Sequence, residues 1–203
     1  MAINSVSAVN VYLIRHPRPL VEPGVCYGLL DLDVGDESLN ETAAHISAAL
    51  PASIDHWFTS PLQRARKLAD TLTGQAEVDK RLVEHNFGDW EGRRWAEIPV
   101  PEFDLWDADF VTKRPPMGES FDELHTRVGS FLEDLRERFA GEEPGNIAVV
   151  THSGVIRSSL CRTLGMPLHK AFSLGIGWNS MAQLRLSANR QLDQVRQLTS
   201  TDW

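Results

Sequence analysis

Three strand-like runs in this chain each end abruptly in charged or polar residues, and helical patterns separate them. The runs are residues 9–14 (VNVYLI), 54–58 (IDHWF) and 147–150 (IAVV). Short apolar runs that alternate with helices are typical of an α/β fold with parallel strands. The sequence therefore predicts a mainly parallel central sheet that is flanked by helices on both faces.

Helical signals follow each predicted strand. Ser60 and Pro61 have the residue types favoured at the N-cap and at the first helical position, so they predict the start of a helix. Ser120 and Glu123 form a capping box before the longest apolar stripe. The expected helices are residues 39–50, 60–74, 120–140, and a fourth that follows residues 151–154 and ends near residue 164.

Residues 83–118 are irregular and rich in tryptophan, proline and acidic residues. Too few apolar positions recur there to predict a regular element, so we expect a long excursion, or small cap, outside the sheet. Residues 180–186 and 194–198 are two further strand-like runs. The chain has no repeat or long linker, and the expected organisation is a single domain over residues 1–203 that includes the cap.

The composition excludes several classes of protein. The formal net charge of −8 makes a basic nucleic-acid-binding surface unlikely, because binding to phosphate backbones needs an excess of Lys and Arg. No apolar run approaches the length of about 20 residues that a membrane span needs, and no secretory signal is visible. Cys26 and Cys161 lie far apart with no CxxC motif, which predicts two free thiols in a reducing compartment. We therefore expect a cytoplasmic protein without nucleic-acid or membrane partners.

Polar side chains at the ends of the three predicted strands are the strongest functional signal. Arg15 and His16 follow the first strand, Ser60 and Arg64 the second, and His152 the third. Because the carboxyl ends of parallel strands meet at one edge of a sheet, we expect these side chains to lie together. Two helices begin at the same edge, and their positive dipole ends favour anions. The sequence thus predicts a local anion site in an acidic protein.

The loop at residues 81–92 (RLVEHNFGDWEG) supplies carboxyl groups for catalysis at this site. A carboxyl group beside a phosphate dianion keeps its proton through like-charge repulsion and can protonate a leaving alkoxide. A neutral imidazole at His16 can attack phosphorus while arginines neutralise the phosphate oxygens. Such chemistry needs no metal and no cofactor. Chemistry alone does not choose among Glu84, Asp89 and Glu91.

Five motifs in series resemble those of the histidine phosphatase (phosphoglycerate-mutase-like) superfamily. They are LIRHPRP at 13–19, TSPLQRAR at 59–66, RLVEHNFGDWEG at 81–92, PPMGESFDEL at 115–124 and VVTHSGVIR at 149–157. The resemblance covers about residues 9–165 and implies a mainly parallel sheet flanked by helices. It also implies a metal-independent phosphatase that acts on a small-molecule phosphate monoester.

The resemblance assigns roles to individual residues. His16 becomes the phosphorylated nucleophile and Glu84 the proton donor, while Arg15, Arg64 and His152 hold the phosphate. Ser60 and Ser153 are further candidates for substrate binding, although Ser60 is equally explained as a helix cap. The cap at residues 83–118 is expected to select the alcohol part of the substrate. The oligomeric state is left open, with a homodimer among the options.

Within the superfamily, residues 15–34 (RHPRPLVEPGVCYGLLDLDV) are most similar to the branch that contains α-ribazole-5′-phosphate phosphatases of cobalamin assembly. Two residues depart from the usual pattern, since Pro17 and Ser153 stand where glycine is common. Pro17 removes one backbone N–H from the phosphate cradle. Two other functions stay open, namely a phosphoglycerate-type mutase and a binding module without catalysis.

Other conspicuous residues are expected to have structural roles. Arg157 is predicted to be an ion-pair partner. The tryptophans of the excursion either stack on a substrate ring or pack the cap, and packing is favoured: Trp90, Trp95 and Trp106. The histidines without a supporting pattern are placed at the surface or the core edge: His45, His56, His85, His125 and His169.

Overall fold

A six-stranded mixed sheet forms the centre of the computed structural model, which describes residues 7–141 and 143–199. The strand order is β3-β2-β4-β1-β5-β6. β4 (Asn146–Thr151) and β2 (His56–Thr59) run parallel to β1 (Ala8–Arg15), as does the short β3 (Glu77–Val78). β5 (Met181–Ser187) and β6 (Gln194–Thr199) complete the other side of the sheet in antiparallel pairing. The predicted α/β fold is confirmed.

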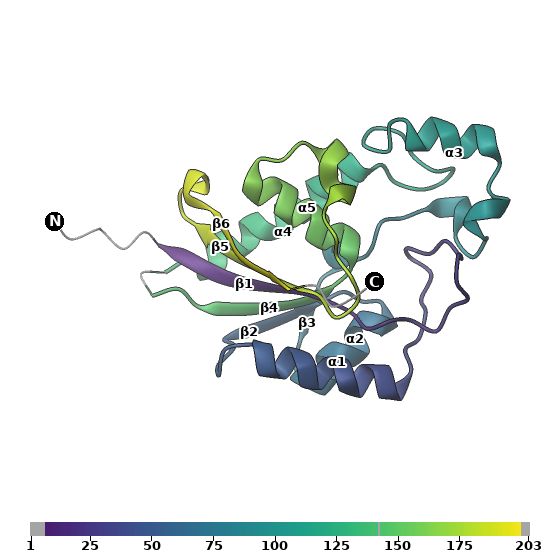
Figure 1. Cartoon of the computed structure of the whole chain (residues 1–203). Coiled ribbons are helices and arrows are strands. Elements are labelled where there is room, and N and C mark those ends of the chain that lie inside the picture. Colours follow the sequence, from purple (N-terminus) through teal and green to yellow (C-terminus); the bar gives the residue numbers. More distant parts are fainter. Residues whose placement is uncertain (1–6, 142, 200–203) are drawn as a thin grey trace.

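Helices cover both faces of the sheet (Figure 1). α1 (Asp36–Ala49) and α2 (Gln63–Leu72) lie on one face, and α4 (Phe121–Phe139) and α5 (Ser153–Leu164) on the other. The alternation of side chains along β1 explains the two cores, because successive residues of a strand point to opposite faces. Val11 and Leu13 pack towards α4 and α5, whereas Tyr12 and Ile14 pack towards α1 and α2.

Strand register brings the carboxyl ends of β1, β2 and β4 to one edge of the sheet. Arg15 pairs with Thr151, and Thr59 pairs with Val150. The ladder continues one residue further, since the amide of His16 donates to the carbonyl of Thr151 at 3.1 Å. The residues that follow these three strands therefore begin side by side.

Two predicted helix starts are wrong in detail. α1 begins at Asp36, three residues before the predicted boundary, with Gly35 as its N-cap. α2 begins at Gln63, with Leu62 rather than Ser60 as its N-cap. The first amide of α2 is instead capped from a distant loop, because Asp31 Oδ1 accepts a hydrogen bond from the amide of Gln63 at 2.6 Å. The residue types of Ser60 and Pro61 predicted the wrong start for α2, because a residue distant in the sequence caps this helix.

The other helix predictions are confirmed. Ser120 is the N-cap of α4, and its capping box with Glu123 is complete. α5 begins at Ser153 directly after β4 and ends at Gly165, whose φ of +61° suits a glycine C-cap. Short 3-10 helices connect the larger elements at Lys80–Leu82, Gly88–Trp90, Trp95–Glu97, Leu168–Ser173 and Arg190–Leu192.

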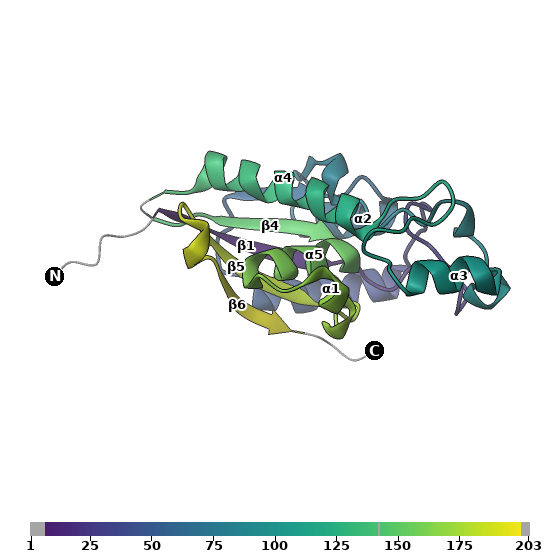
Figure 2. The same ribbon diagram turned by 90° about the horizontal axis from the view of Figure 1, so that it is seen from above.

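The excursion at residues 83–118 lies beyond the end of the sheet and contains a helix that the sequence did not predict, α3 (Val100–Asp107) (Figures 1 and 2). It has a core of its own. Trp90 and Trp106 are buried against Cys26 and Ile98, and Trp95 packs on them. The packing interpretation of the tryptophans is thus confirmed. The role of this segment in substrate selection stays a prediction.

Two further sequence expectations can be compared with the described residues. Cys26 and Cys161 are both buried free thiols, as predicted. Among the helices of residues 7–141 and 143–199, none is long and apolar enough to cross a membrane.

Candidate active site

His16 and His152 come from neighbouring strand ends and face each other. Their ring centroids are 4.9 Å apart at an interplanar angle of 61°, and both side chains are almost completely buried. Ser60 stands on the third strand end, where its amide donates to the carbonyl of Val150 at 3.0 Å. The structure therefore brings together residues from the ends of β1, β2 and β4, as the parallel arrangement predicts.

The hydrogen bonds of His16 define which ring nitrogen is available. Nδ1 lies 2.6 Å from the carbonyl oxygen of Pro17, so Nδ1 must carry the proton and donate it. Nε2 lies 3.3 Å from Nε of Arg64, which is a donor, so Nε2 carries the lone pair. Burial, followed by the positive charges of Arg64 and Arg15, holds the pKa of His16 well below its usual range. His16 is thus a neutral imidazole whose Nε2 carries an available lone pair.

Arg64 is fully buried on the first turn of α2, and its guanidinium is fixed by backbone oxygens. Nη2 donates to the carbonyl of Gly28 at 2.6 Å and Nη1 to that of Leu30 at 2.8 Å, while the ring of Tyr27 lies 5.4 Å from the guanidinium carbon. Within the described ranges no carboxylate forms an ion pair with it. A buried cation without an ionic partner suits an anionic ligand.

Glu91 holds the loop that positions Arg64. Its Oε1 accepts hydrogen bonds from the amides of Leu29 at 2.9 Å and Phe87 at 3.1 Å, and its Oε2 accepts one from Leu30 at 2.5 Å. Three backbone donors are thereby satisfied by one carboxylate. Glu91 supports the carbonyl oxygens that bind Arg64, and we find no role for it as a proton donor at the histidines.

Asp31 and Gly28 fix the same loop at two other points. The carboxylate of Asp31 accepts hydrogen bonds from the amide and the side-chain amide of Gln63, which ties the loop to the start of α2. A Cβ atom at Gly28 would lie 1.7 Å from the carbonyl oxygen of His85, so only glycine fits there. Both residues lie in the segment 26–31 (CYGLLD), and no feature of the sequence alone predicted these contacts.

Arg15 approaches the site from the end of β1. Its Nη1 donates to the carbonyl of Ile176 at 2.6 Å, and its guanidinium carbon lies 5.3 Å from the ring of Trp178. Nε of Arg15 is buried and has no hydrogen-bond partner among the described residues. An unpartnered buried donor of this kind again favours an anionic ligand.

His152 is the N-cap of α5 and contacts Ser60. Its Nε2 lies 2.8 Å from Oγ of Ser60, and its Nδ1 has no hydrogen-bond partner among the described residues. Burial, then the positive charge of Arg64, holds the pKa of His152 well below its usual range. Ser60 is not the N-cap of α2, because Leu62 takes that position; its Oγ accepts a hydrogen bond from the amide of Leu62 at 3.3 Å and also contacts His152.

Glu84 is buried at the N-terminal end of α5. Its oxygens accept hydrogen bonds from the amides of Gly154 at 3.0 Å and His85 at 2.9 Å, and from Oγ of Ser153 at 3.0 Å. Burial alone would raise the pKa of Glu84, but the two amides and the charges of the nearby arginines outweigh it and lower the pKa below its usual value. Of the three carboxyl groups in the 81–92 loop, Glu84 is the one held among the predicted site residues.

Comparison with known proteins decides the family. The sequence model of the histidine phosphatase superfamily (branch 1) matches residues 11–197. The chain belongs to this superfamily. It is 28% identical to a putative phosphoserine phosphatase 2 of Hydrogenobacter thermophilus, over 94% of this chain and 99% of the relative. It is 26% identical to an adenosylcobalamin/alpha-ribazole phosphatase of Salmonella typhimurium, over 79% and 75% of the two chains.

Solved structures agree with this histidine phosphatase fold. A putative alpha-ribazole-5′-P phosphatase of Escherichia coli superposes with a TM-score of 0.82 at 25% identity, over 95% of this chain and 97% of that one. A mycobacterial glucosyl-3-phosphoglycerate phosphatase has the same TM-score at 24% identity, over 96% and 100% of the two chains, and supports the fold alone. The predicted superfamily and its fold are confirmed.

A small cavity of the histidine phosphatase opens beside Glu84. Its volume is about 100 Å³. The predicted residues Arg15, Glu84 and Ser153 line one side. The remaining side chains of its lining come from residues that the sequence analysis did not assign to the site: Tyr27, His85, Phe87, Phe121, Arg157 and Phe172.

Two predictions about the lining of this cavity are wrong. His85 is not a surface or core-edge residue, because it is only 3% exposed and its Nε2 lies 2.8 Å from the carbonyl of Glu119. Arg157 has no ion-pair partner in the described part of the chain, and its Nε donates instead to the carbonyl of Leu174 at 3.1 Å. The position of Arg157 on a helix does not reveal that its side chain turns towards the site. No other feature of the sequence predicted this orientation.

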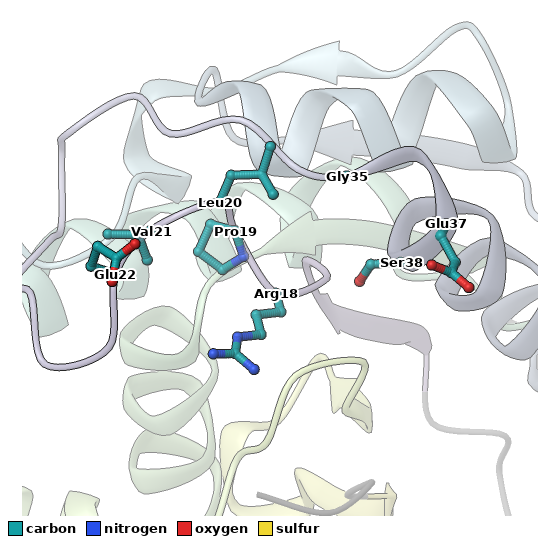
Figure 3. Close-up of a pocket in the computed structure, with 8 residues that line it drawn as sticks. All are labelled: Arg18, Pro19, Leu20, Val21, Glu22, Gly35, Glu37 and Ser38. Atoms are coloured by element: carbon teal, nitrogen blue, oxygen red, sulfur yellow. The ribbon is translucent and has the colours of Figure 1, made fainter.

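A larger and more open hollow lies next to residues 18–22 and the start of α1 (Figure 3). Its volume is about 690 Å³, and none of the predicted catalytic residues lines it. Arg18, Glu22 and Glu37 point in different directions around it, so it offers no concentrated charge. The candidate site is therefore the histidine pair and not this hollow.

The described residues contain no group of three or more His, Cys, Asp or Glu side chains that could hold a metal ion.

Proposed function

We propose that this histidine phosphatase hydrolyses phosphate monoesters through a phosphoryl group carried on Nε2 of His16. One observation carries the proposal. A neutral buried imidazole presents its lone pair next to the guanidinium of Arg64, which has no ionic partner among the described residues. A nucleophile beside an unneutralised cation suits a phosphate dianion as its ligand. The phosphatase names of several relatives support the same reaction class.

The phosphate of the substrate binds among Arg15, Arg64 and His152. The two guanidinium groups neutralise its oxygens, and Ser60 and Ser153 offer hydroxyl groups. Entry of a dianion raises the pKa of His152, because its charge offsets the arginines that lower it. His152 then becomes a donor to the phosphate. The amino end of α5 adds its positive dipole.

In the first step, Nε2 of His16 attacks phosphorus and the bond between phosphorus and the ester oxygen breaks. The leaving alkoxide takes a proton from the carboxyl group of Glu84. The pKa of this carboxyl is low in the free protein, and the bound dianion raises it towards protonation by like-charge repulsion. An alcohol leaves and phospho-His16 remains.

In the second step, water attacks phosphorus and the bond between Nε2 and phosphorus breaks. Glu84, now a carboxylate, takes the proton from the water. The hydrogen bond from Nδ1 of His16 to the carbonyl of Pro17 keeps the imidazole in one orientation during both steps. This carbonyl is the contribution of Pro17, which has no backbone N–H to offer to the phosphate. The products are the alcohol and inorganic phosphate.

The alcohol part of the substrate is a separate proposal. Two relatives are named adenosylcobalamin/alpha-ribazole phosphatases, which supports the α-ribazole-5′-phosphate prediction made from residues 15–34. Two others are named phosphoserine phosphatases. The position of residues 83–118 next to the cavity, through Glu84, His85 and Phe87, supports a part for the cap in this choice.

Hydrolysis of p-nitrophenyl phosphate tests the reaction class. We expect nitrophenol and phosphate to be released in the presence of EDTA, and His16→Ala to abolish the release. Unaltered release by His16→Ala, or no release by the wild type from any of a panel of monoesters, would contradict the proposal. Incubation with 3-phosphoglycerate separates the two reaction types, because a mutase returns an isomeric ester whereas a phosphatase returns phosphate.

A further inference from the structure

We propose that Arg157 binds a carboxylate on the leaving group, so that the preferred substrates are phosphate monoesters of short carboxylic acids. This inference rests on the proposed function, since it concerns the alcohol part of the same substrate. It assigns a second anion subsite, next to the phosphate site, in the cavity beside Glu84.

Arg157 is held with its terminal nitrogens unused. Its Nε donates to the carbonyl of Leu174 at 3.1 Å, and its guanidinium carbon lies 5.2 Å from the ring centroid of Phe172. Among the described residues, neither terminal nitrogen has a hydrogen-bond partner and no carboxylate forms an ion pair with this side chain. A guanidinium fixed on one edge and free on the other is prepared to bind a carboxylate through two parallel hydrogen bonds.

No neighbouring carboxylate takes this role. Glu84 is close enough to act on Arg157 electrostatically. However, its two oxygens already accept hydrogen bonds from Gly154, His85 and Ser153. In the reaction it must also be protonated when the substrate is bound. Arg157 therefore needs an anion that comes with the ligand.

The balance of charge favours a second anion on the substrate. Arg15, Arg64 and Arg157 together supply three positive charges around the phosphate site and the cavity. A phosphate dianion beside a protonated Glu84 neutralises two of them. A carboxylate on the leaving group supplies the third negative charge next to Arg157, which is partly buried and has no ion-pair partner among the described residues.

The size and the lining of the cavity favour a short leaving group. Its volume of about 100 Å³ is well below the range of about 300–1,000 Å³ typical of pockets for drug-sized ligands. Phe87, Phe121 and Phe172 provide apolar walls of the cavity that Arg157 also lines. A short hydroxy or amino acid fills this space, whereas the nucleoside-sized alcohol of α-ribazole phosphate would extend out of it.

The test compares pairs of esters that differ only in the carboxylate. One pair is phosphoserine and phosphoethanolamine, and the other is 3-phosphoglycerate and glycerol 3-phosphate. We expect kcat/KM to be about tenfold higher, or more, for the carboxylate-bearing member of at least one pair. Arg157→Gln should lower this ratio at least tenfold towards unity. Arg157→Lys should retain an intermediate ratio, and the exposed Arg66→Gln, which also removes one positive charge, should leave the ratio unchanged.

The ratio of kcat/KM between the two members of each pair, together with hydrolysis of p-nitrophenyl phosphate, separates the two proposals. If p-nitrophenyl phosphate is not hydrolysed at all, the proposed function fails. If the enzyme is active but treats both members of each pair alike, or if Arg157→Gln lowers both equally, the carboxylate subsite is wrong and Arg157 serves the phosphate or the fold. The wild-type comparison needs no variant, and Arg157→Lys provides the measurement if Arg157→Gln does not fold.

Discussion

Gly154 and Glu84 are in such close contact that a Cβ atom on residue 154 would stand 2.3 Å from Oε1 of Glu84. The amide of Gly154 donates to both oxygens of the carboxylate, at 3.0 and 3.2 Å. The absence of a side chain at position 154 therefore lets the first turn of α5 hold the proposed proton donor against the phosphate site.

Gly154→Ala should displace the carboxylate of Glu84 and lower kcat by about 100-fold, because small misplacements of a catalytic group have large effects. Steady-state kinetics with p-nitrophenyl phosphate measures this. Gly35→Ala is the matched control, since the nearest atom to its added methyl group would be at an ordinary 3.7 Å. A wild-type kcat in Gly154→Ala would show that Glu84 is not the group that protonates the leaving alcohol.

Removing the carboxylate of Glu91 should weaken phosphate binding indirectly, through the loop that holds Arg64. Glu91→Ala leaves the amides of Leu29, Leu30 and Phe87 without their acceptor. The carbonyls that hold Arg64 then lose their support. We expect a loss of about 1–3 kcal/mol in the free energy of unfolding and a clear rise in the Kd for inorganic phosphate.

Urea unfolding and calorimetric titration with phosphate measure these two effects of Glu91→Ala. The exposed Glu137→Ala on α4 serves as the control and should change neither. A variant with normal phosphate affinity and lowered stability would restrict Glu91 to a purely structural role.

Ser60→Ala should affect the site more than the stability of α2. Its hydroxyl lies 2.8 Å from Nε2 of His152, whereas Leu62 is the N-cap of the helix. Loss of one hydrogen bond in the phosphate cradle predicts about a fivefold to tenfold rise in the Kd for phosphate or vanadate. Thermal unfolding measured in parallel should shift little. A large loss of stability with unchanged affinity would restore the helix-capping interpretation.

The lowered pKa values of His16 and His152 predict how stability depends on pH. The pKa values of His16 and His152 are held well below normal in the folded protein, mainly by burial, while the unfolded chain has histidines with a pKa of about 6.5. Below about pH 6.5 the unfolded chain binds more protons than the folded protein, so stability falls as the pH is lowered. Above that pH these two histidines do not change the stability.

Urea unfolding between pH 5 and 8 measures this dependence. Each buried histidine contributes a slope of up to about 1.4 kcal/mol per pH unit on the acid side. His152→Gln should reduce the slope, whereas the exposed His45→Gln should not change it. An identical slope in wild type and His152→Gln would mean that His152 is readily protonated in the folded state.

The cluster of Arg15, His16 and His152 could be predicted because these residues follow directly from the strand ends. Parallel pairing of β1, β2 and β4 brings Arg15, His16 and His152 together whatever the surrounding loops do. Helices with complete local signals were predicted in the same way, as the capping box of Ser120 shows.

Long-range contacts explain what the sequence did not reveal. Asp31 caps α2 across 32 positions of the chain, so the local Ser-Pro signal gave the wrong start. Arg157 contacts Leu174, and Glu91 contacts residues 29, 30 and 87. No short sequence pattern predicts these contacts. α3 lacks a clear apolar stripe because its side chains pack within the small cluster of the cap.

Trapping the phosphorylated protein during turnover tests the central proposal most directly. The enzyme is mixed with a radiolabelled monoester, denatured in base within milliseconds, and digested to locate the label. We predict one acid-labile, base-stable phosphate on the peptide that contains His16, and none in His16→Asn. Turnover without any protein-bound phosphate, or a label on another residue, would contradict the account.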